Sequence, residues 1–182
     1  MSLILPQPLV VPVPPPNCAQ VVFRADDNNL GSRAIQWFTE FPYSHAEVTV
    51  DEAHGGTIVA AQTAWQAEQT DPGVQNYPLD YDYWSTRQVI YRAHMTPQMY
   101  HDWVEYLFDQ CGKPFDHTAF VGIVLHNLNL HERGAVFCSM LIEMSLIAVH
   151  FWHGLGIPAN GVTPQELYVA IAADPRWVEY KP

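Results

Sequence analysis

Short runs of alternating apolar and polar residues dominate the first half of the chain and predict a sheet. In HAEVTVDE, residues 45–52, apolar Ala46, Val48 and Val50 alternate with polar residues, which is typical of a strand with one buried face. The run TIVAAQ, residues 57–62, follows a His-Gly-Gly turn at 54–56, and this arrangement predicts an antiparallel hairpin. AQVVFRA at 19–25 and RQVIYRA at 87–93 predict two further strands.

Capping residues mark the expected helices. Segment 31–41 carries Ile, Trp and Phe at helical spacing, with Ser32 as its expected N-cap and Pro42 as its expected end. A Thr-Pro pair at 96–97 predicts a second helix that runs to about residue 110.

The remaining segments have weaker or different periods. Residues 138–153 are apolar nearly all round, which predicts a helix packed on most of its faces, and TPQE at 163–166 predicts a final capped helix. The stretch 115–130 is compatible with either helix or strand. Residues 66–86 are polar and rich in tyrosine, and we expect a loop that lies over a site.

Length and composition indicate a single domain with an acidic surface. Six prolines make residues 1–18 an extended lead-in, and residues 19–182 of the 182-residue chain are expected to share one core. The formal net charge of −11 argues against nucleic acid and anionic membranes as partners and favours neutral or cationic ones. No integral membrane segment and no signal peptide are recognisable, so a cytoplasmic protein is expected. The oligomeric state stays open.

Three cysteines form neither a disulfide framework nor a metal knuckle, and we expect reduced thiols at Cys18, Cys111 and Cys138. No HExxH motif occurs, and the histidine pairs 126/131 and 150/153 have no convincing third ligand. A metal hydrolase is therefore the least supported function class, and neither a metal site nor another cofactor is expected.

Two interpretations of Cys138 remain open at this point. A buried cysteine packs like a small apolar residue, which is the simpler interpretation. If a helix begins at Cys138, however, unpaired amides and the positive end of the helix dipole would stabilise its thiolate. A nucleophilic cysteine also needs a base. His45 is the candidate, because it opens a strand between the small residues Ser44 and Ala46, although a surface histidine at a strand edge is the alternative.

Several motifs together resemble a known family. SHAEV at 44–48, IVAAQ at 58–62, GKPFD at 112–116, FCSMLI at 137–142 and TPQEL at 163–167 follow one another in a characteristic order. In this order they resemble the circularly permuted NlpC/P60, papain-like proteins of the YiiX/YaeF type. The resemblance implies an α+β fold in which a central antiparallel sheet is packed by the helix that bears the cysteine.

The resemblance also implies catalytic residues. The nucleophile maps to Cys138 and the base to His45, whereas the third residue is often the Glu of an [IV]-E-A motif, which is Ala60 here. Gln62 lies two positions further on the same side of the strand and is the expected substitute, with Glu47 a weaker candidate. A Cys-His dyad without a third side chain is the other possibility.

Two functions follow from these residues. The first is a cysteine amidase or peptidase that acts on a small peptide, a cell-wall fragment or an acyl-amide. The second is a catalytically degenerate binding module, suggested by the missing acid. Substrate contacts are expected from Ser44 and Ser139 beside the two catalytic residues, and from aromatic side chains of the 66–86 loop, namely Tyr77, Tyr81, Tyr83 and Trp84.

Overall fold

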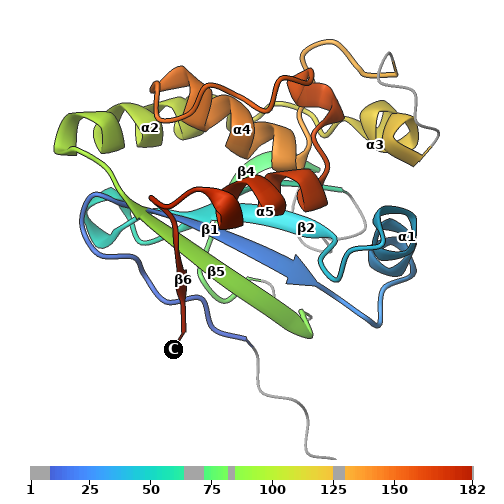
Figure 1. Ribbon diagram of the computed structural model, residues 1–182, viewed down its shortest axis with the longest axis horizontal. Coiled ribbons are helices and arrows are strands. Elements are labelled where there is room, and N and C mark those ends of the chain that lie inside the picture. Colours follow the sequence, from blue (N-terminus) through green and yellow to red (C-terminus); the bar gives the residue numbers. More distant parts are fainter. Residues whose placement is uncertain (1–8, 64–71, 82–84, 125–129, 182) are drawn as a thin grey trace, which may run out of the picture.

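A six-stranded antiparallel sheet forms the centre of the computed structural model, which describes residues 9–63, 72–81, 85–124 and 130–181 (Figure 1). The order across the sheet is β4-β3-β2-β1-β5-β6. The strands are β1 (Cys18–Ala25), β2 (His45–Thr49), β3 (Ile58–Gln62), β4 (Gly73–Tyr77), β5 (Arg87–His94) and β6 (Val178–Tyr180). The helices are α1 (Leu30–Thr39), α2 (Pro97–Asp109), α3 (His117–Val124), α4 (Cys138–Ala148) and α5 (Pro164–Ala173), with short 3-10 helices at Glu52–His54 and Ala159–Gly161.

The expected hairpin is confirmed, because β2 and β3 pair in antiparallel fashion. The connection turns at Gly55 and Gly56, whose φ values of 97° and 55° lie in the left-handed region that glycine adopts at little cost. β1 and β5 also form at the two segments that were predicted to be strands, and they pair with each other along their whole length.

Two strands were not predicted. β4 lies inside the segment 66–86 that was expected to be a loop, and its sequence GVQNY combines Val74 and Tyr77, which favour strands, with Gly73 and Asn76, which do not. It forms through its pairing with β3, from Ile58–Tyr77 to Gln62–Gly73. β6 has only three residues, and its pairing with β5, which places it at the edge of the sheet, defines it.

The helix predictions hold, with corrections to the bounds of α1 and α4. α2 and α5 begin with Thr-Pro as expected, and Thr163 and Glu166 form a complete capping box. The N-cap of α1 is Asn29 rather than Ser32, because the Asn29 side chain accepts from the amides of Gly31 and Ser32. The helix ends at Thr39, before Pro42.

Segment 138–153 is helical only as far as Ala148. Beyond it the chain turns back, with His150 at φ 55° and the amides of Phe151 and Trp152 both directed at the carbonyl of Leu146. The ambiguous stretch 115–130 contributes α3.

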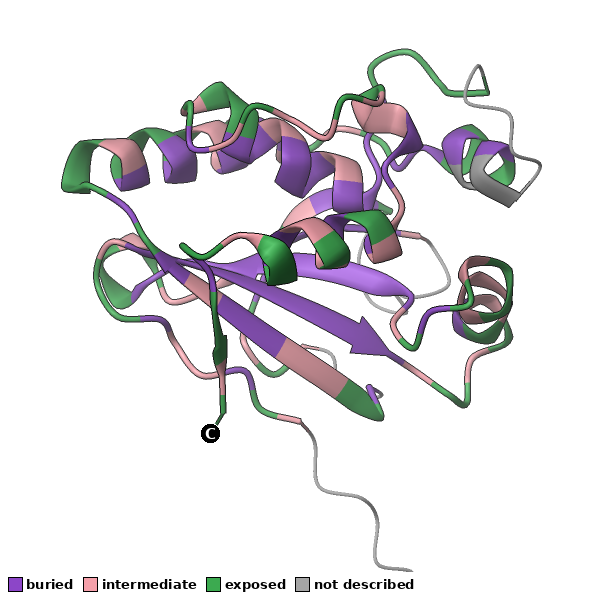
Figure 2. Cartoon of the chain, in the orientation of Figure 1, coloured by how far each residue is buried: buried purple, intermediate pink, exposed green. Residues whose placement is uncertain are grey.

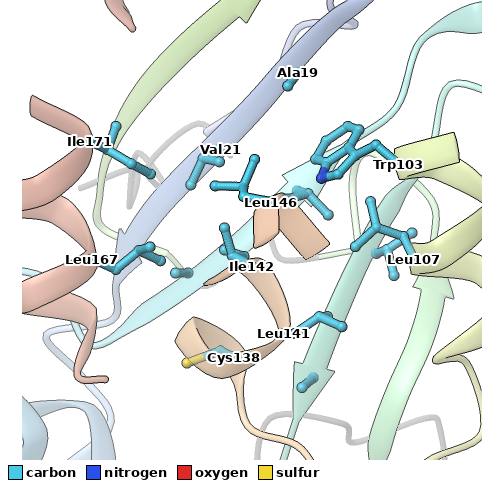
Figure 3. Packing of buried hydrophobic residues seen from close by; sticks show 14 of the residues in the cluster. Ala19, Val21, Trp103, Leu107, Cys138, Leu141, Ile142, Leu146, Leu167 and Ile171 are labelled. Carbon is cyan, nitrogen blue, oxygen red and sulfur yellow. The ribbon is translucent and has the colours of Figure 1, made fainter. Parts of the chain in front are cut away.

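Helices α2, α4 and α5 cover one face of the sheet, and the main core lies between them and the strands (Figures 1 and 2). Leu141, Ile142 and Leu146 of α4 are almost fully buried there, as is Trp103 of α2 (Figure 3). The indole N–H of Trp103 donates to Ser145. The apolar character of α4 on nearly all sides is therefore explained by contacts with β2, β3, α2 and α5. This packing fixes α4 on the sheet and Cys138 at its first turn.

A smaller apolar cluster occupies the other face of the sheet. It joins Val22, Ile58, Ala60, Tyr77 and Ile90 to Val11 of the N-terminal lead-in, which is fully buried. Gln20 holds the lead-in by donating to the carbonyl of Pro12 at 2.8 Å. The described part of the proline-rich segment thus lies along the sheet without regular secondary structure.

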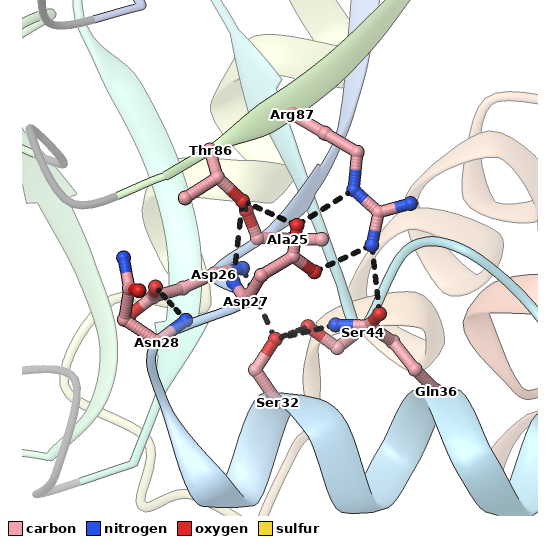
Figure 4. Close-up of polar contacts among 9 residues, drawn as sticks. All are labelled: Ala25, Asp26, Asp27, Asn28, Ser32, Gln36, Ser44, Thr86 and Arg87. Carbon is pink, nitrogen blue, oxygen red and sulfur yellow. Dashed lines mark hydrogen bonds and ion pairs between the residues drawn. The ribbon is translucent and has the colours of Figure 1, made fainter. Parts of the chain in front are cut away.

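Helix α1 contacts the sheet through polar groups rather than through the expected apolar side (Figure 4). The hydroxyl of Ser32 bonds to that of Ser44 at 2.6 Å and accepts from the amide of Asp26, and Gln36 accepts from Arg87. Leu30, Trp37 and Phe38 face outward instead, and Trp37 is 74% exposed. The polar contacts fix the chain directly before β2.

Candidate active site

The segment that leads into α4 is held by the GKPFD motif. Phe115 and Val136 form a parallel bridge, and the amide of Val136 donates to the carbonyl of Pro114 at 2.9 Å. The carboxylate of Asp116 accepts from the amide of Ala119 at 2.7 Å and from that of Glu132 at 3.1 Å. These bonds set the direction in which the chain enters α4 at Cys138.

Ser139 fixes the first turn of α4 from its other side. Its hydroxyl donates to the carbonyl of Val162 at 2.5 Å, and the side chain is fully buried. This hydroxyl therefore anchors the helix and does not face a substrate, contrary to what was expected for Ser139.

Cys138 is the first residue of α4 and is 7% exposed. Its N-cap residue, Phe137, provides no side-chain acceptor for the first amides of the helix. Burial raises the pKa of the Cys138 thiol, but a hydrogen bond with His45 and the charge of that ring lower it. The amides of Ala46 and Ser139 also donate to the sulfur, and the net result is a pKa below the usual value.

His45 is the first residue of β2, where it pairs with Arg24 of β1. The ring is only 5% exposed and contacts the Cys138 sulfur, so the structure brings these two predicted residues together. Ser44 is buried as well, and its hydroxyl bonds to Ser32 while its amide donates to the carbonyl of Arg24. Ser44 therefore supports the start of β2, and the expected substrate contact through its hydroxyl is not supported.

The other side of the imidazole faces Glu47. These two residues lie two positions apart on β2, so their side chains leave the same face of the strand. Oε2 of Glu47 is 3.7 Å from Nε2 of His45, and Oε1 forms an ion pair with Nε of Arg24 at 2.6 Å. The carboxylate is fully buried and is held beside the imidazole by the charge of Arg24 on the neighbouring strand.

Gln62 does not take the position that was expected for it. Among the residues that the structure describes, neither Oε1 of Gln62 nor Nε2 of His45 has a hydrogen-bond partner, so the predicted bond from the ring to the amide oxygen is not formed. The amide Nε2 of Gln62 instead donates to the hydroxyl of Tyr81 at 2.5 Å, and this hydroxyl donates to Oε2 of Glu47. Gln62 is therefore connected to His45 through Tyr81 and Glu47 rather than directly.

The strand register explains why Glu47 can occupy this position. β2 and β3 pair at Val48–Val59 and Thr49–Ile58, and continuing this register places Glu47 opposite Ala60. Ala60 is the position at which the resemblance leads one to expect an acid. The carboxylate of Glu47 on β2 thus lies directly opposite Ala60, the position on β3 that has no acid.

The aromatic residues expected to line a cleft are only partly described. Tyr77 is 4% exposed and its ring stacks on that of Tyr81, with centroids 4.4 Å apart. It belongs to the small cluster on the second face of the sheet, so an open substrate wall formed by Tyr77 is not supported. Tyr83 and Trp84 lie outside the described residues.

The two other thiols differ from Cys138. All three cysteines are free, as expected. Burial raises the pKa of Cys18 and of Cys111, and the charge of Arg92 only partly offsets this effect at Cys18. Of the three thiols, only Cys138 has a lowered pKa.

The described part of the chain meets the requirements of neither a metal site of three or more ligands nor a membrane-spanning helix. Within it, no group of three or more His, Cys, Asp or Glu side chains is arranged to hold a metal ion. His150 and His153 are exposed, and His126 lies outside the described residues. None of the described helices has the length and apolar character needed to cross a membrane.

The fold has a known counterpart. The crystal structure of the metalloprotein yiiX from Escherichia coli O157:H7 is similar, with a TM-score of 0.62 over 91% of this chain and 97% of that chain. The two sequences are 16% identical, and the likeness establishes a shared α+β fold. No family model matches the chain, and no curated protein matches it.

The sequence interpretation did not name Arg24, and it named Tyr81 only as an aromatic side chain of the expected cleft. It placed Glu47 behind Gln62 as the group beside His45. A signal for Glu47 was present, because its spacing from His45 is that of two neighbours on one face of a strand. Arg24 stands in an apolar strand, where a charge is expected to have a partner. Nothing local to Tyr81 indicates that its hydroxyl lies between Gln62 and Glu47.

Proposed function

We propose that this protein is a cysteine hydrolase that cleaves an amide or related acyl bond, with Cys138 as nucleophile and His45 as base. The observation that carries the proposal is the hydrogen bond between these side chains at the start of α4, together with the lowered pKa of Cys138. A lowered thiol pKa beside an imidazole at a helix N-terminus is typical of activated cysteines.

The proposed reaction has two stages. The Cys138 thiolate attacks the carbonyl carbon, a C–S bond forms, and the negative oxygen is stabilised by amides at the first turn of α4. The His45 imidazolium then donates its proton to the leaving nitrogen as the C–N bond breaks. In the second stage His45 accepts a proton from water, the hydroxide attacks the thioester, and the acid is released with the thiol restored.

Glu47 supports this cycle by electrostatics. Its buried carboxylate lies 3.7 Å from His45 Nε2, where it stabilises the imidazolium and orients the ring. The degenerate binding module was suggested by the missing acid at Ala60. A carboxylate from β2 beside the imidazole weakens that reason, and the hydrolase is the better supported proposal.

The substrate class follows from the resemblance and from charge. A small peptide, a cell-wall fragment or an acyl-amide provides the carbonyl that this chemistry needs. The net charge of −11 favours a neutral or cationic substrate over a polyanion.

Acyl-enzyme trapping tests the proposal. The protein is mixed with p-nitrophenyl acetate, and mass spectrometry of its peptides should find one acetyl group on Cys138, with release of p-nitrophenol. Cys138→Ala should abolish the acylation, and Cys111→Ala is the matched control that should leave it unchanged. Because the structural neighbour is described as a metalloprotein, the assay is repeated with EDTA.

Two outcomes would contradict the proposal. Acylation that is equal in Cys138→Ala would remove this residue from the chemistry, and the binding module would become the better explanation. Acylation that disappears with EDTA and returns with added metal would favour a metal-dependent reaction instead.

A further inference from the structure

Two fully buried charges lie directly behind the Cys138–His45 pair. The side chains of Arg24 and Glu47 are 1% and 0% exposed, and Nε of Arg24 lies 2.6 Å from Oε1 of Glu47. An ionised carboxylate that is removed from water is costly unless a positive partner lies close, and otherwise it takes up a proton. The ionisation state of Glu47 therefore depends on its neighbours.

The described groups around Glu47 come from β1, from β2 and from the segment that follows β4. Arg24 of β1 contacts one carboxylate oxygen, while the other oxygen accepts from the Tyr81 hydroxyl and faces Nε2 of His45 on β2. Tyr81 also stacks on Tyr77, and the Arg24 guanidinium lies 5.9 Å from the Tyr81 ring. Of these groups, Arg24 is the one that carries a permanent positive charge.

We propose that Arg24 is a positioning residue of the active site, which keeps Glu47 ionised and directed at His45 so that the imidazolium–thiolate pair of His45 and Cys138 is favoured. This inference rests on the proposed function and adds a regulator of the same site. Without Arg24, Glu47 takes up a proton in its buried position, and a neutral carboxyl no longer stabilises the imidazolium. Cys138 then loses its proton only at higher pH.

The test is the pH profile of Cys138 alkylation by iodoacetamide, measured by peptide mass spectrometry with Cys18 and Cys111 as internal references. Arg24→Gln should raise the midpoint by about one pH unit, the lower end of what an opposite charge at this range contributes. Arg24→Lys should recover part of the shift, because it restores the charge. A structural role alone would not distinguish Lys from Gln in this profile.

Arg92→Gln is the matched control. Arg92 lies on the neighbouring strand β5, where its Nε donates to Gln20 and its charge acts on Cys18. Its removal should move the profile of Cys18 upward and leave that of Cys138 unchanged. The control therefore separates a local effect of Arg24 from a general loss of positive charge.

Glu47→Gln provides a second, independent variant if Arg24→Gln does not fold, as judged by circular dichroism. It should raise the Cys138 midpoint in the same direction, and Arg24→Gln added to it should cause little further change. Folded Arg24→Gln with the wild-type midpoint would overturn the inference. So would an unchanged midpoint in Glu47→Gln, or Arg24→Lys that behaves like Arg24→Gln.

The failure of this inference differs from the failure of the proposed function. If wild-type Cys138 titrates like Cys18 and is not acylated, the hydrolase proposal fails first. If wild-type Cys138 is reactive and depends on His45 while Arg24→Gln has no effect, only the role of Arg24 is refuted.

Discussion

Replacing His45 by alanine should convert Cys138 from an activated thiol into an ordinary buried one. In the folded protein, burial raises the pKa of Cys138, and the hydrogen bond and charge of His45 are the largest effects that lower it. His45→Ala removes both and leaves only the amides of Ala46 and Ser139. The midpoint of Cys138 alkylation should therefore rise to the unperturbed value of about 8.5 or above it.

The size of the effect follows from the thiolate fraction. At pH 6 a thiol with a pKa of about 8.5 is roughly 0.3% ionised. In the wild type His45 lowers the pKa of Cys138, and each unit of lowering raises the thiolate fraction at this pH about tenfold. Because a more acidic thiolate is an intrinsically weaker nucleophile, part of this difference cancels, and we expect labelling at pH 6 to slow severalfold in His45→Ala, on the order of threefold for each unit by which His45 lowers the pKa.

The assay follows iodoacetamide incorporation at Cys138 over a range of pH values, and the midpoint is compared rather than the absolute rate, because access to a 7% exposed residue limits the rate. His153→Ala is the matched control, since His153 is exposed and should not change the profile. Equal midpoints for Cys138 in wild type and in His45→Ala would refute the reasoning, and with it the role of His45 as base.

Three further predictions concern how α4 is held. Ser139→Ala should lower the free energy of unfolding by about 1–2 kcal/mol in urea denaturation, because the carbonyl of Val162 loses its partner, yet leave the Cys138 midpoint unchanged; a shifted midpoint would contradict this. Burial raises the pKa of Glu143, so the folded protein loses stability as pH rises through that pKa and the carboxyl ionises. The Tm of Glu143→Gln should therefore increase relative to that of the wild type between about pH 4 and 7. A Tm difference that stays constant over this range would contradict the prediction. Leu146→Ala removes a fully buried side chain and should lower the free energy of unfolding by about 3 kcal/mol in the same urea assay. A loss below about 1 kcal/mol would contradict the prediction and show that neighbouring side chains fill the cavity.

Local patterns in the sequence were sufficient for most of the elements. Strict alternation marks β2, and a Thr followed by Pro marks the start of α2 and α5, because these signals act over a few residues. The all-round apolar run after Cys138 correctly indicates a helix buried on most faces. The position of Cys138 at a helix start and of His45 at a strand start could be recognised for the same reason.

The orientation of α1 and the existence of β4 could not be read from local pattern. The apolar residues of α1 predict a buried side, but Ser32 and Gln36 bond to Ser44 and Arg87, groups distant in sequence, and this turns Trp37 outward. β4 forms although Gly73 and Asn76 disfavour strands, because the edge of β3 provides hydrogen-bonding partners.

The chain by itself thus determined that a cysteine, a histidine and several polar candidates would lie near one end of the sheet. The tertiary structure decided which candidate faces the imidazole. Gln62 and Glu47 both point to a suitable side of their strands, but Arg24 pairs with Glu47 across β1 and β2, while Tyr81 engages Gln62. Strand register brings these residues together from segments far apart in sequence. The Glu47 carboxylate can be buried beside His45 because Arg24 supplies the opposite charge at that position.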